Sequence, residues 1–195
     1  RNAGGVLNPT ILKRYTLAWN GVAFFDHALP TYRNFEEEFD TTIFQDIPIL
    51  HYFSQLSDHN NWSVAAHSKG LNQFLLPPIL QSNRECIQGD LGYAKLHNVG
   101  KLEIQKMLDL YSQYLTAENL LQESFEYSQL KLHPDKVVYQ GIEAKNIVFC
   151  EGFGLKKNPW FSYLPLTGSK GEFLHIRTDK LSSNEIIKAG LFIVP

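Results

Sequence analysis

Apolar side chains recur at helical spacing in two parts of the chain, and capping residues mark a third helix. The first stripe predicts a long helix near the N-terminus, with a kink or a second start at Pro30. Its members are Tyr15, Trp19, Val22, Leu29 and Phe35. Residues 57–69 predict a shorter helix, with Ser57 as its N-cap and Gly70 after its end. The clearest stripe follows residue 101 and consists of Ile104, Met107, Leu108, Tyr111, Tyr114 and Leu115.

Other stretches carry strand signals, because their apolar positions alternate or run without interruption. We expect strands over residues 43–53 (interrupted at Pro48), 91–97, 120–127, 137–140, 146–150, 171–177 and 189–194. Residues 71–89 and 179–185 are expected to be loops with short ordered pieces. The run over 146–150 favours a strand that is buried on both faces. The order of elements predicts an α+β fold class, with a mixed or antiparallel sheet and packed helices.

Composition is typical of a folded protein and excludes several classes of function. The chain has 195 residues, of which 44% are hydrophobic and 19% are charged, and this length suits one domain or two small lobes. The net charge is −2, so we expect no nucleic-acid partner. No apolar run reaches the length of a membrane span, so we expect no membrane association. The chain has two cysteines, Cys86 and Cys150. Because two are too few for a disulfide framework, we expect a reducing compartment, the cytoplasm.

Local motifs for other chemistries are incomplete. The segment Ala66-His67-Ser68-Lys69-Gly70 is similar to a nucleophile elbow, but it follows a predicted helix rather than a strand. His51, His59 and His67 are not spaced as the ligands of a known zinc motif. Gly152-Phe153-Gly154 lacks the third glycine of a dinucleotide-binding loop. We therefore expect no metal site and no complete dinucleotide fingerprint within this sequence.

Three segments carry motifs whose order is more specific than any one of them alone. The first is AGGVLNP over residues 3–9, the second is AKNIVFCEG over 144–152, and the third is LPLTGSKGEFLHI over 164–176. Together they resemble the glycine oxidase and D-amino-acid oxidase family of FAD-dependent oxidoreductases. In that family a small glycine-rich loop lies under the flavin, an apolar strand closes the FAD-binding sheet, and a basic-Gly-acidic segment re-enters the substrate domain.

The resemblance implies two interleaved lobes and a redox function. Residues 13–99 and 159–195 would form a substrate-binding lobe, and residues 1–12 and 100–158 would form part of an FAD-binding lobe. The family oxidises an amine or amino acid by hydride transfer to flavin, so the expected cofactor is FAD and the expected partner is a small-molecule amine or amino-acid substrate. The family's N-terminal GxGxxG unit and its C-terminal segment have no counterpart here. The sequence is therefore expected to be the middle of such an enzyme, inactive alone and weak or deficient in FAD binding.

The resemblance also implies a set of cofactor-binding residues. Gly4 and Gly5 would allow the backbone to approach the flavin, and Gly152 would lie close to the dinucleotide. Glu151 stands where the family has a small residue, and its carboxylate is expected to turn away from the cofactor's phosphates. Phe125 is a candidate for an adenine contact and, alternatively, a core aromatic residue.

Substrate recognition has a candidate strand, and two other functions stay open. Tyr93, Lys95 and His97 share one face of the strand expected over 91–97 and could bind a substrate carboxylate, although polar residues at alternate positions are more typical of a solvated face. The first alternative function is a non-catalytic α+β binding module. The second is a serine hydrolase that uses Ser68. The catalytic residues, the electron acceptor and the oligomeric state do not follow from the sequence.

Overall fold

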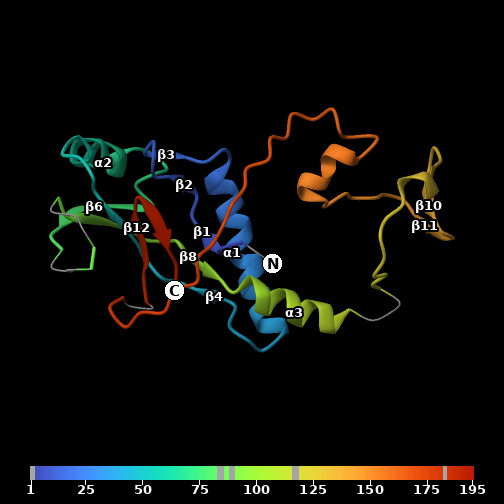
Figure 1. The fold of residues 1–195 in the computed structure, drawn as a ribbon, viewed down its shortest axis with the longest axis horizontal. Helices are drawn as coiled ribbons and strands as arrows, with labels where there is room; N and C mark the ends of the chain where they lie inside the picture. The colour runs from blue at the N-terminus through green and yellow to red at the C-terminus, as the bar shows by residue number, and fades with distance from the viewer. Residues whose placement is uncertain (1–2, 83–85, 88–90, 116–118, 182–183) are drawn as a thin grey trace. The chain divides into compact units, whose positions relative to one another are not determined.

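The protein is described by a computed structural model, which covers residues 3–82, 86–87, 91–115, 119–181 and 184–195. Its contacts divide the chain into two units, the first comprising Arg1–Tyr114 and Ile176–Pro195 and the second comprising Leu115–His175. Helices accompany mixed and antiparallel sheets, which confirms the predicted α+β class (Figure 1). Among the helices in the described ranges, none combines the length and apolar character needed to cross a bilayer.

The largest sheet of the first unit has five strands, in the order β13-β12-β5-β7-β6. They are β5 (Ile49–Tyr52), β6 (Leu75–Leu80), β7 (Tyr93–Leu96), β12 (Ile186–Ala189) and β13 (Leu191–Ile193). β12 runs parallel to β5, and the other neighbours are antiparallel. The strand predicted over 91–97 is confirmed as β7. The loop predicted over 71–89 contains β6, an edge strand that accommodates two prolines because one of its sides needs no partner.

Helix α2 (Ser57–His67) covers one face of this sheet, close to β6 and β5 (Figure 1). Its buried residues are Trp62, Ala65 and Ala66. The indole N–H of Trp62 donates to the carbonyl oxygen of Leu76 at 2.9 Å, which fixes the helix to the edge strand. Ser57 is the first residue of the helix and makes no capping hydrogen bond, so the predicted helix is confirmed while its predicted N-cap is wrong.

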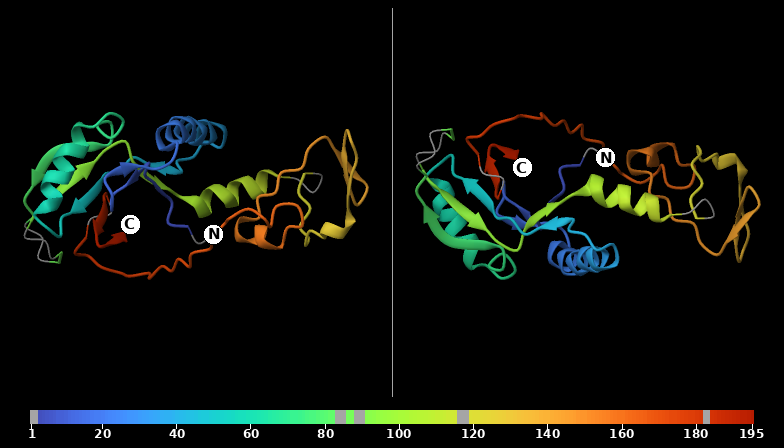
Figure 2. Two further views of the ribbon diagram at one scale, coloured as in Figure 1. Left: turned by 90° about the horizontal axis from the view of Figure 1, so that it is seen from above. Right: turned by 90° about the horizontal axis from the view of Figure 1, so that it is seen from below.

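A second, smaller sheet of the first unit is antiparallel and has the order β1-β8-β4. It consists of β1 (Val6–Leu7), β4 (Phe44–Gln45) and β8 (Gly100–Leu102). Helices α1 (Gly21–Glu38) and α3 (Ile104–Tyr114) contribute the apolar residues that pack on it (Figure 2). The predicted strand over 43–53 is therefore two strands in two sheets, separated around Pro48.

The first helix is shorter than its apolar stripe predicts. Tyr15 and Asn20 both have a left-handed backbone, with φ of 50°, and this geometry cannot continue an α-helix. Residues before Asn20 instead form a small hairpin of β2 (Thr10–Ile11) and β3 (Thr16–Leu17). Pro30 lies inside α1, so the predicted second start is wrong.

The second unit contains a three-stranded antiparallel meander. Its strands are β9 (Leu130–Leu132), β10 (Val137–Tyr139) and β11 (Ile142–Ala144), preceded by the 3₁₀ turn η1 (Tyr127–Gln129) and followed by η2 (Gly152–Lys157). The buried strand predicted over 146–150 is wrong, since these residues form no strand and Val148 is 80% exposed. The strands predicted over 120–127 and 171–177 are also absent from the described residues.

The end of the chain forms a hairpin where one strand was expected. The loop predicted over 179–185 lies partly outside the described residues, and residues 184–185 lead into β12. The strand predicted over 189–194 is the second arm of the hairpin, β13. Gly190 connects the arms with φ of 77°, a conformation that glycine adopts without strain. The parallel pairing of β12 with β5 joins segments that are far apart in the sequence.

Candidate functional site

Two of the three predicted substrate-binding residues lie together on the large sheet. Tyr93 and Lys95 occupy alternate positions of β7 and therefore point to the same face. In the register, Tyr93 lies opposite Tyr52 and Lys95 lies opposite Leu50. His97 follows the strand directly, and its backbone N–H donates to the carbonyl oxygen of Phe74 at 2.9 Å.

This face of the sheet is apolar rather than a solvated surface. Strand alternation and register place the following residues on it: Leu50, Tyr52, Tyr93, Lys95, Ile187, Ala189 and Ile193. Leu50, Tyr52 and Ile187 are buried, and Ile87 and Leu181 from the neighbouring loops pack against them. Lys95 is half-buried at this cluster. We call this surface the Lys95 face.

Two tyrosine rings lie side by side on the Lys95 face. The rings of Tyr52 and Tyr93 stack with their centroids 5.1 Å apart. The Tyr52 hydroxyl also lies 3.2 Å from the hydroxyl of Ser82. The sequence pattern did not identify Tyr52 as a site residue, because its closeness to Tyr93 depends on which strands pair and in which register.

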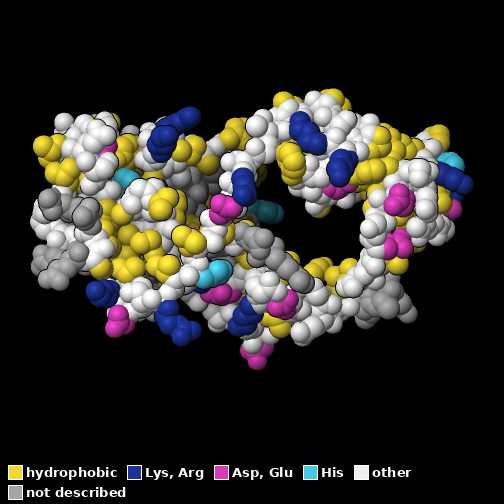
Figure 3. Space-filling view, in the orientation of Figure 1, with side chains coloured by type: hydrophobic (Ala, Val, Ile, Leu, Met, Phe, Trp, Pro, Cys, Tyr) yellow, Lys and Arg dark blue, Asp and Glu magenta, His cyan; other side chains and the backbone are white. Residues whose placement is uncertain are grey.

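Neither polar group of β7 on this face has a partner in the ranges that the structure describes. No carboxylate there lies within ion-pair distance of Lys95, and no hydrogen bond is made by the Tyr93 hydroxyl. Hydrophobic side chains gather over the β12–β13 end of the sheet, where Leu191 is 80% exposed (Figure 3). The face thus combines an ammonium group and a phenol with apolar surroundings.

The opposite face of the sheet holds a half-buried histidine. His51 stacks on Trp62 with centroids 5.6 Å apart, and its Nε2 lies 3.3 Å from the Tyr15 hydroxyl. Burial, together with the nearby Lys188 ammonium, lowers the pKa of His51 to about 4. Burial and the Asp58 carboxylate raise the pKa of Tyr15 to about 12. Near neutral pH both rings are therefore uncharged, and this cluster is part of the core beneath α2.

The predicted flavin loop lies in the first unit, and contacts within the chain explain why a glycine stands at position 5. Gly5 has φ of 69°, and a Cβ there would collide with the carbonyl oxygen of Leu102. The Leu102 N–H in turn donates to the Gly5 carbonyl at 2.7 Å. The close backbone approach at Gly5 is thus an approach to β8, and the neighbouring Gly4 is half-buried beside it.

The other predicted cofactor residues lie in the second unit. Gly152 has φ of 56° and no atom within 4 Å of the position of an added Cβ, so its backbone is open to a ligand. Phe125 stacks on Tyr139 with centroids 4.4 Å apart and also contacts Phe149 edge-on. These contacts place Phe125 in the aromatic cluster of this unit, where its side chain is 36% exposed.

The Glu151 carboxylate is held by two neutral donors. It accepts hydrogen bonds from the Tyr127 hydroxyl and, at 2.9 Å, from the side-chain amide of Asn158. Asn158 is fully buried, and its Oδ1 accepts from the backbone N–H groups of Trp160 and Phe161. The carboxylate therefore faces this turn. Nothing in the sequence pattern singled out Asn158, whose role depends on its burial.

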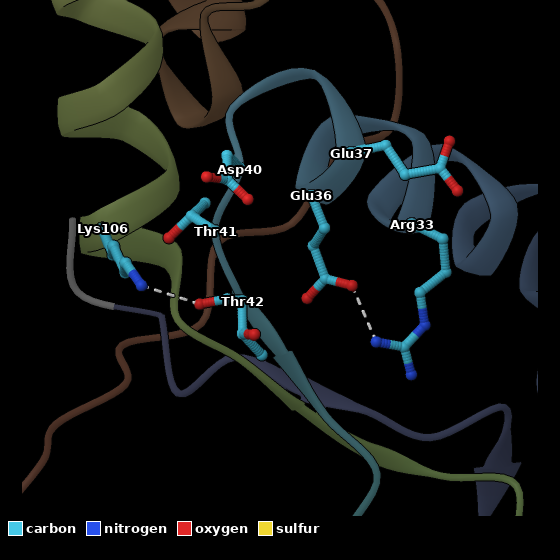
Figure 4. A pocket seen from close by; sticks show the side chains of 7 residues that line it. All are labelled: Arg33, Glu36, Glu37, Asp40, Thr41, Thr42 and Lys106. Carbon is cyan, nitrogen blue, oxygen red and sulfur yellow. Dashed lines mark hydrogen bonds and ion pairs between the residues drawn. The ribbon is translucent and has the colours of Figure 1, made fainter.

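A polar hollow of about 660 Å³ lies where α1, the start of β4 and α3 meet (Figure 4). Its lining residues are Arg33, Glu36, Glu37, Asp40, Thr41, Thr42 and Lys106. Arg33 pairs with Glu36 at 2.7 Å and also with Asp46, and Lys106 donates to the Thr42 carbonyl at 2.9 Å. Because these cations already have partners, we interpret the hollow as a structural junction.

The geometry around Ser68 differs from that of an activated nucleophile. Ser68 follows the end of α2, and its hydroxyl donates to the Val64 carbonyl at 2.9 Å. The adjacent His67 uses Nδ1 to contact the Ser63 carbonyl at 2.7 Å. Within the described ranges, no group of three or more His, Cys, Asp or Glu side chains is arranged to hold a metal ion.

Comparisons with known proteins assign no family to the chain. No model of a protein family matches it. No solved structure matches it at a significant level.

Proposed function

We propose that this chain supplies the substrate-binding sheet and part of the flavin lobe of an FAD-dependent oxidoreductase that oxidises an amine or amino acid. The observation that carries the proposal is the parallel pairing of Ile49–His51 with Ile186–Lys188. The resemblance assigns both segments to one substrate-binding lobe, although most of the chain separates them. A sheet built from these two segments is the arrangement that interleaved lobes require.

A second pairing supports the same proposal. Val6 and Leu7 of β1 pair with Lys101 and Gly100 of β8. The resemblance assigns residues 1–12 and 100–158 to the flavin lobe, so β1 and β8 bring two distant parts of that lobe side by side. β8 also pairs with β4, which lies in the range that the resemblance assigns to the substrate-binding lobe, so this sheet joins segments of both expected lobes.

Two adjacent residues of the second unit, Glu151 and Gly152, are compatible with the proposed cofactor role. The open backbone at Gly152 leaves room for a ligand, and Glu151 directs its carboxylate to Tyr127 and Asn158 rather than to a phosphate. When bound, FAD would accept a hydride from the substrate carbon next to nitrogen. The chain's own part is to bind and orient the substrate.

The proposal is tested by the reading frame that surrounds this sequence and by flavin titration. We expect the upstream frame to encode a strand–GxGxxG–helix unit, which would place free N–H groups of a helix N-terminus at the pyrophosphate. A polypeptide that includes this unit should purify with FAD, and a substrate should bleach its flavin absorbance without oxygen. The 195-residue chain should bind FAD much more weakly. A longer polypeptide without bound flavin would contradict the proposal.

A further inference from the structure

Two aromatic rings are exposed where α1 begins. Trp19 is 81% exposed and Phe24 is 56% exposed, and their rings pack edge to face with centroids 5.6 Å apart. The other two tryptophans of the chain are covered, Trp62 completely and Trp160 in part. Tryptophan is highly buried on average, because its ring removes a large apolar area from water. An exposed pair of this size indicates a surface that meets a partner.

The β2–β3 hairpin extends this surface. Thr10 and Leu17 form one pair of its register, in which Thr10 is buried and Leu17 packs against the main core. The adjacent pair, which includes Ile11, therefore points outward. The turn between the strands carries Lys13 and Arg14, both exposed. We call the following exposed side chains the Trp19 patch: Ile11, Lys13, Arg14, Trp19 and Phe24.

The cations of the Trp19 patch have no counter-charge. Neither Lys13 nor Arg14 forms an ion pair with any described residue. Residues 3–25 contain no Asp or Glu, although the whole chain carries a net charge of −2. Lys69 adds a third cation beside the hairpin, because a Cβ on the adjacent Gly70 would meet the Leu17 side chain. Lys and Arg side chains gather at this end of the unit, with hydrophobic ones beside them (Figure 3).

Two carboxylates on neighbouring elements are directed elsewhere. Asp58 is half-buried on α2, where it accepts from the backbone N–H of Gln55 at 3.3 Å. Asp26 follows Phe24 by two residues on α1, which places it about 200° around the helix axis from that ring. The Trp19 patch is therefore both apolar and positively charged.

Exposed aromatic rings beside unpaired cations match the surface of a bilayer. Tryptophan and phenylalanine enter the zone between headgroups and acyl chains, and basic side chains at the same level attract anionic headgroups. A single-stranded nucleic acid would need open ring faces for stacking, and in an edge-to-face pair one ring covers a face of the other. The expectation of no membrane association rested on the length of apolar runs, which a surface contact does not need.

We propose that the Trp19 patch binds the surface of a bilayer that contains anionic lipids. Trp19 and Phe24 insert at the level of the headgroups, and Lys13 and Arg14 lie against the lipid anions. The contact is weak and reversible, because it consists of a few side chains rather than a spanning helix. It is independent of the proposed redox function and needs no flavin.

Binding is tested by co-sedimentation of the 195-residue chain with vesicles of phosphatidylcholine, with and without phosphatidylglycerol as the anionic lipid. Affinity for the anionic vesicles should be roughly tenfold higher or more, and added salt should lower it. Tryptophan emission should shift to shorter wavelength and become shielded from acrylamide, because Trp19 is the most exposed of the three tryptophans.

Charge reversal separates a local contact from an effect of net charge. Lys13→Glu combined with Arg14→Glu should weaken binding to the anionic vesicles at least tenfold. The matched control is Lys131→Glu combined with Lys145→Glu, which makes the same change in net charge at two exposed lysines of the second unit. The control should bind like wild type.

Replacement of the exposed ring tests insertion. Trp19→Ser should weaken binding and abolish the emission shift, whereas Tyr163→Ser, at a tyrosine that is 76% exposed, should do neither. Far-ultraviolet circular dichroism checks that each variant is folded.

Five results would overturn the proposal. They are no binding of wild type to the anionic vesicles, equal losses in the two charge-reversed pairs, wild-type binding by a folded Trp19→Ser variant, an emission shift with a single-stranded oligonucleotide but not with vesicles, and an emission shift that grows with protein concentration alone. The last result would assign the Trp19 patch to a contact between two copies of the chain. None of these results affects the flavin titration of the longer polypeptide, which decides the redox function separately.

Discussion

The Glu151 carboxylate and the Asn158 side-chain amide face each other at 2.9 Å in the second unit of the chain. Asn158 is fully buried and also accepts two backbone hydrogen bonds, from Trp160 at 2.9 Å and from Phe161 at 3.1 Å. Around this polar pair lie the stacked rings of Phe149 and Trp160, whose centroids are 5.8 Å apart. The pair therefore organises both the turn after η2 and the aromatic cluster beside it.

Asn158→Asp should disrupt this turn although it replaces only the side-chain amide by a carboxylate. The new carboxylate faces that of Glu151 and cannot donate to it, so one hydrogen bond becomes a repulsion between partly buried charges. We expect a loss of about 3 kcal/mol in local stability. Hydrogen exchange at the amides of Trp160 and Phe161 measures it, because both N–H groups bond to residue 158.

Adding Glu151→Gln to Asn158→Asp should restore most of that protection. The glutamine amide would donate to the new carboxylate at position 158, and its carbonyl would accept from the Tyr127 hydroxyl, so the same contacts return with donor and acceptor exchanged. Glu126→Gln, combined with the same Asn158→Asp change, is the control and should restore nothing. Equal exchange rates in the single and double variants would show that the two side chains are not coupled.

The second unit shows what local pattern could not predict. Residues 146–150 are apolar enough for a buried strand, yet a strand becomes buried only when other elements cover it. Among the described residues nothing does so at Val148, which is 80% exposed. The sequence pattern did not predict the role of Asn158, because an Asn-Pro pair ordinarily marks a surface turn. The burial of Asn158 arises instead from tertiary packing.

The first unit was more predictable because its signals were local. The stripe that begins at Ile104 predicted α3, and alternation predicted β7 and hence the shared face of Tyr93 and Lys95. Alternation could not show that this face is apolar, since its neighbours Leu50 and Ile187 come from strands whose pairing is set by the fold. Polar residues at alternate positions are typical of a solvated face, but the register places apolar neighbours beside Lys95.

His51 should make the first unit sensitive to acid. Burial lowers its pKa to about 4 from 6.5, so the unfolded chain takes up a proton on this residue at a higher pH than the folded chain does. The stabilising effect of the neutral ring is therefore complete above pH 6.5 and is lost as the pH falls toward 4. The loss is on the order of 3 kcal/mol at most. Urea unfolding from about pH 7 down to about pH 4 measures it.

His51→Phe should flatten this pH dependence, because phenylalanine can stack on Trp62 but cannot take up a proton. Asp58, Lys188 and Tyr15 also face this position and remain in the variant, so a residual slope reports their contribution. His67→Gln removes a histidine at the end of α2 and should leave the slope as it is in wild type. A wild-type slope in His51→Phe would assign the acid sensitivity to other groups.

Glu36 should be the most important charged residue at the polar hollow for stability. Its Oε1 accepts from the backbone N–H groups of Ile43 and Phe44, at 2.7 and 2.8 Å. Burial alone would raise the pKa of Glu36, but these hydrogen bonds and the Arg33 guanidinium lower it. Glu36→Ala leaves both donors unpaired and should cost about 2–4 kcal/mol in the free energy of unfolding. Glu37→Ala, at the exposed neighbour, should change it by less than about 0.5 kcal/mol. Similar losses in both variants would refute this role.

Gly5→Ala should destabilise the first unit more than the same change at Gly190. Both glycines have a left-handed backbone, with φ of 69° and 77°, and alanine loses about 1 kcal/mol in that conformation at either position. At Gly190 nothing lies within 4 Å of the added Cβ, so the cost should end there. At Gly5 the methyl group meets the carbonyl oxygen of Leu102 and forces β1 away from β8, which raises the expected loss to about 3 kcal/mol. Urea midpoints of the two variants decide between this packing role and a loop held open for flavin, because an open loop would give equal losses at both positions.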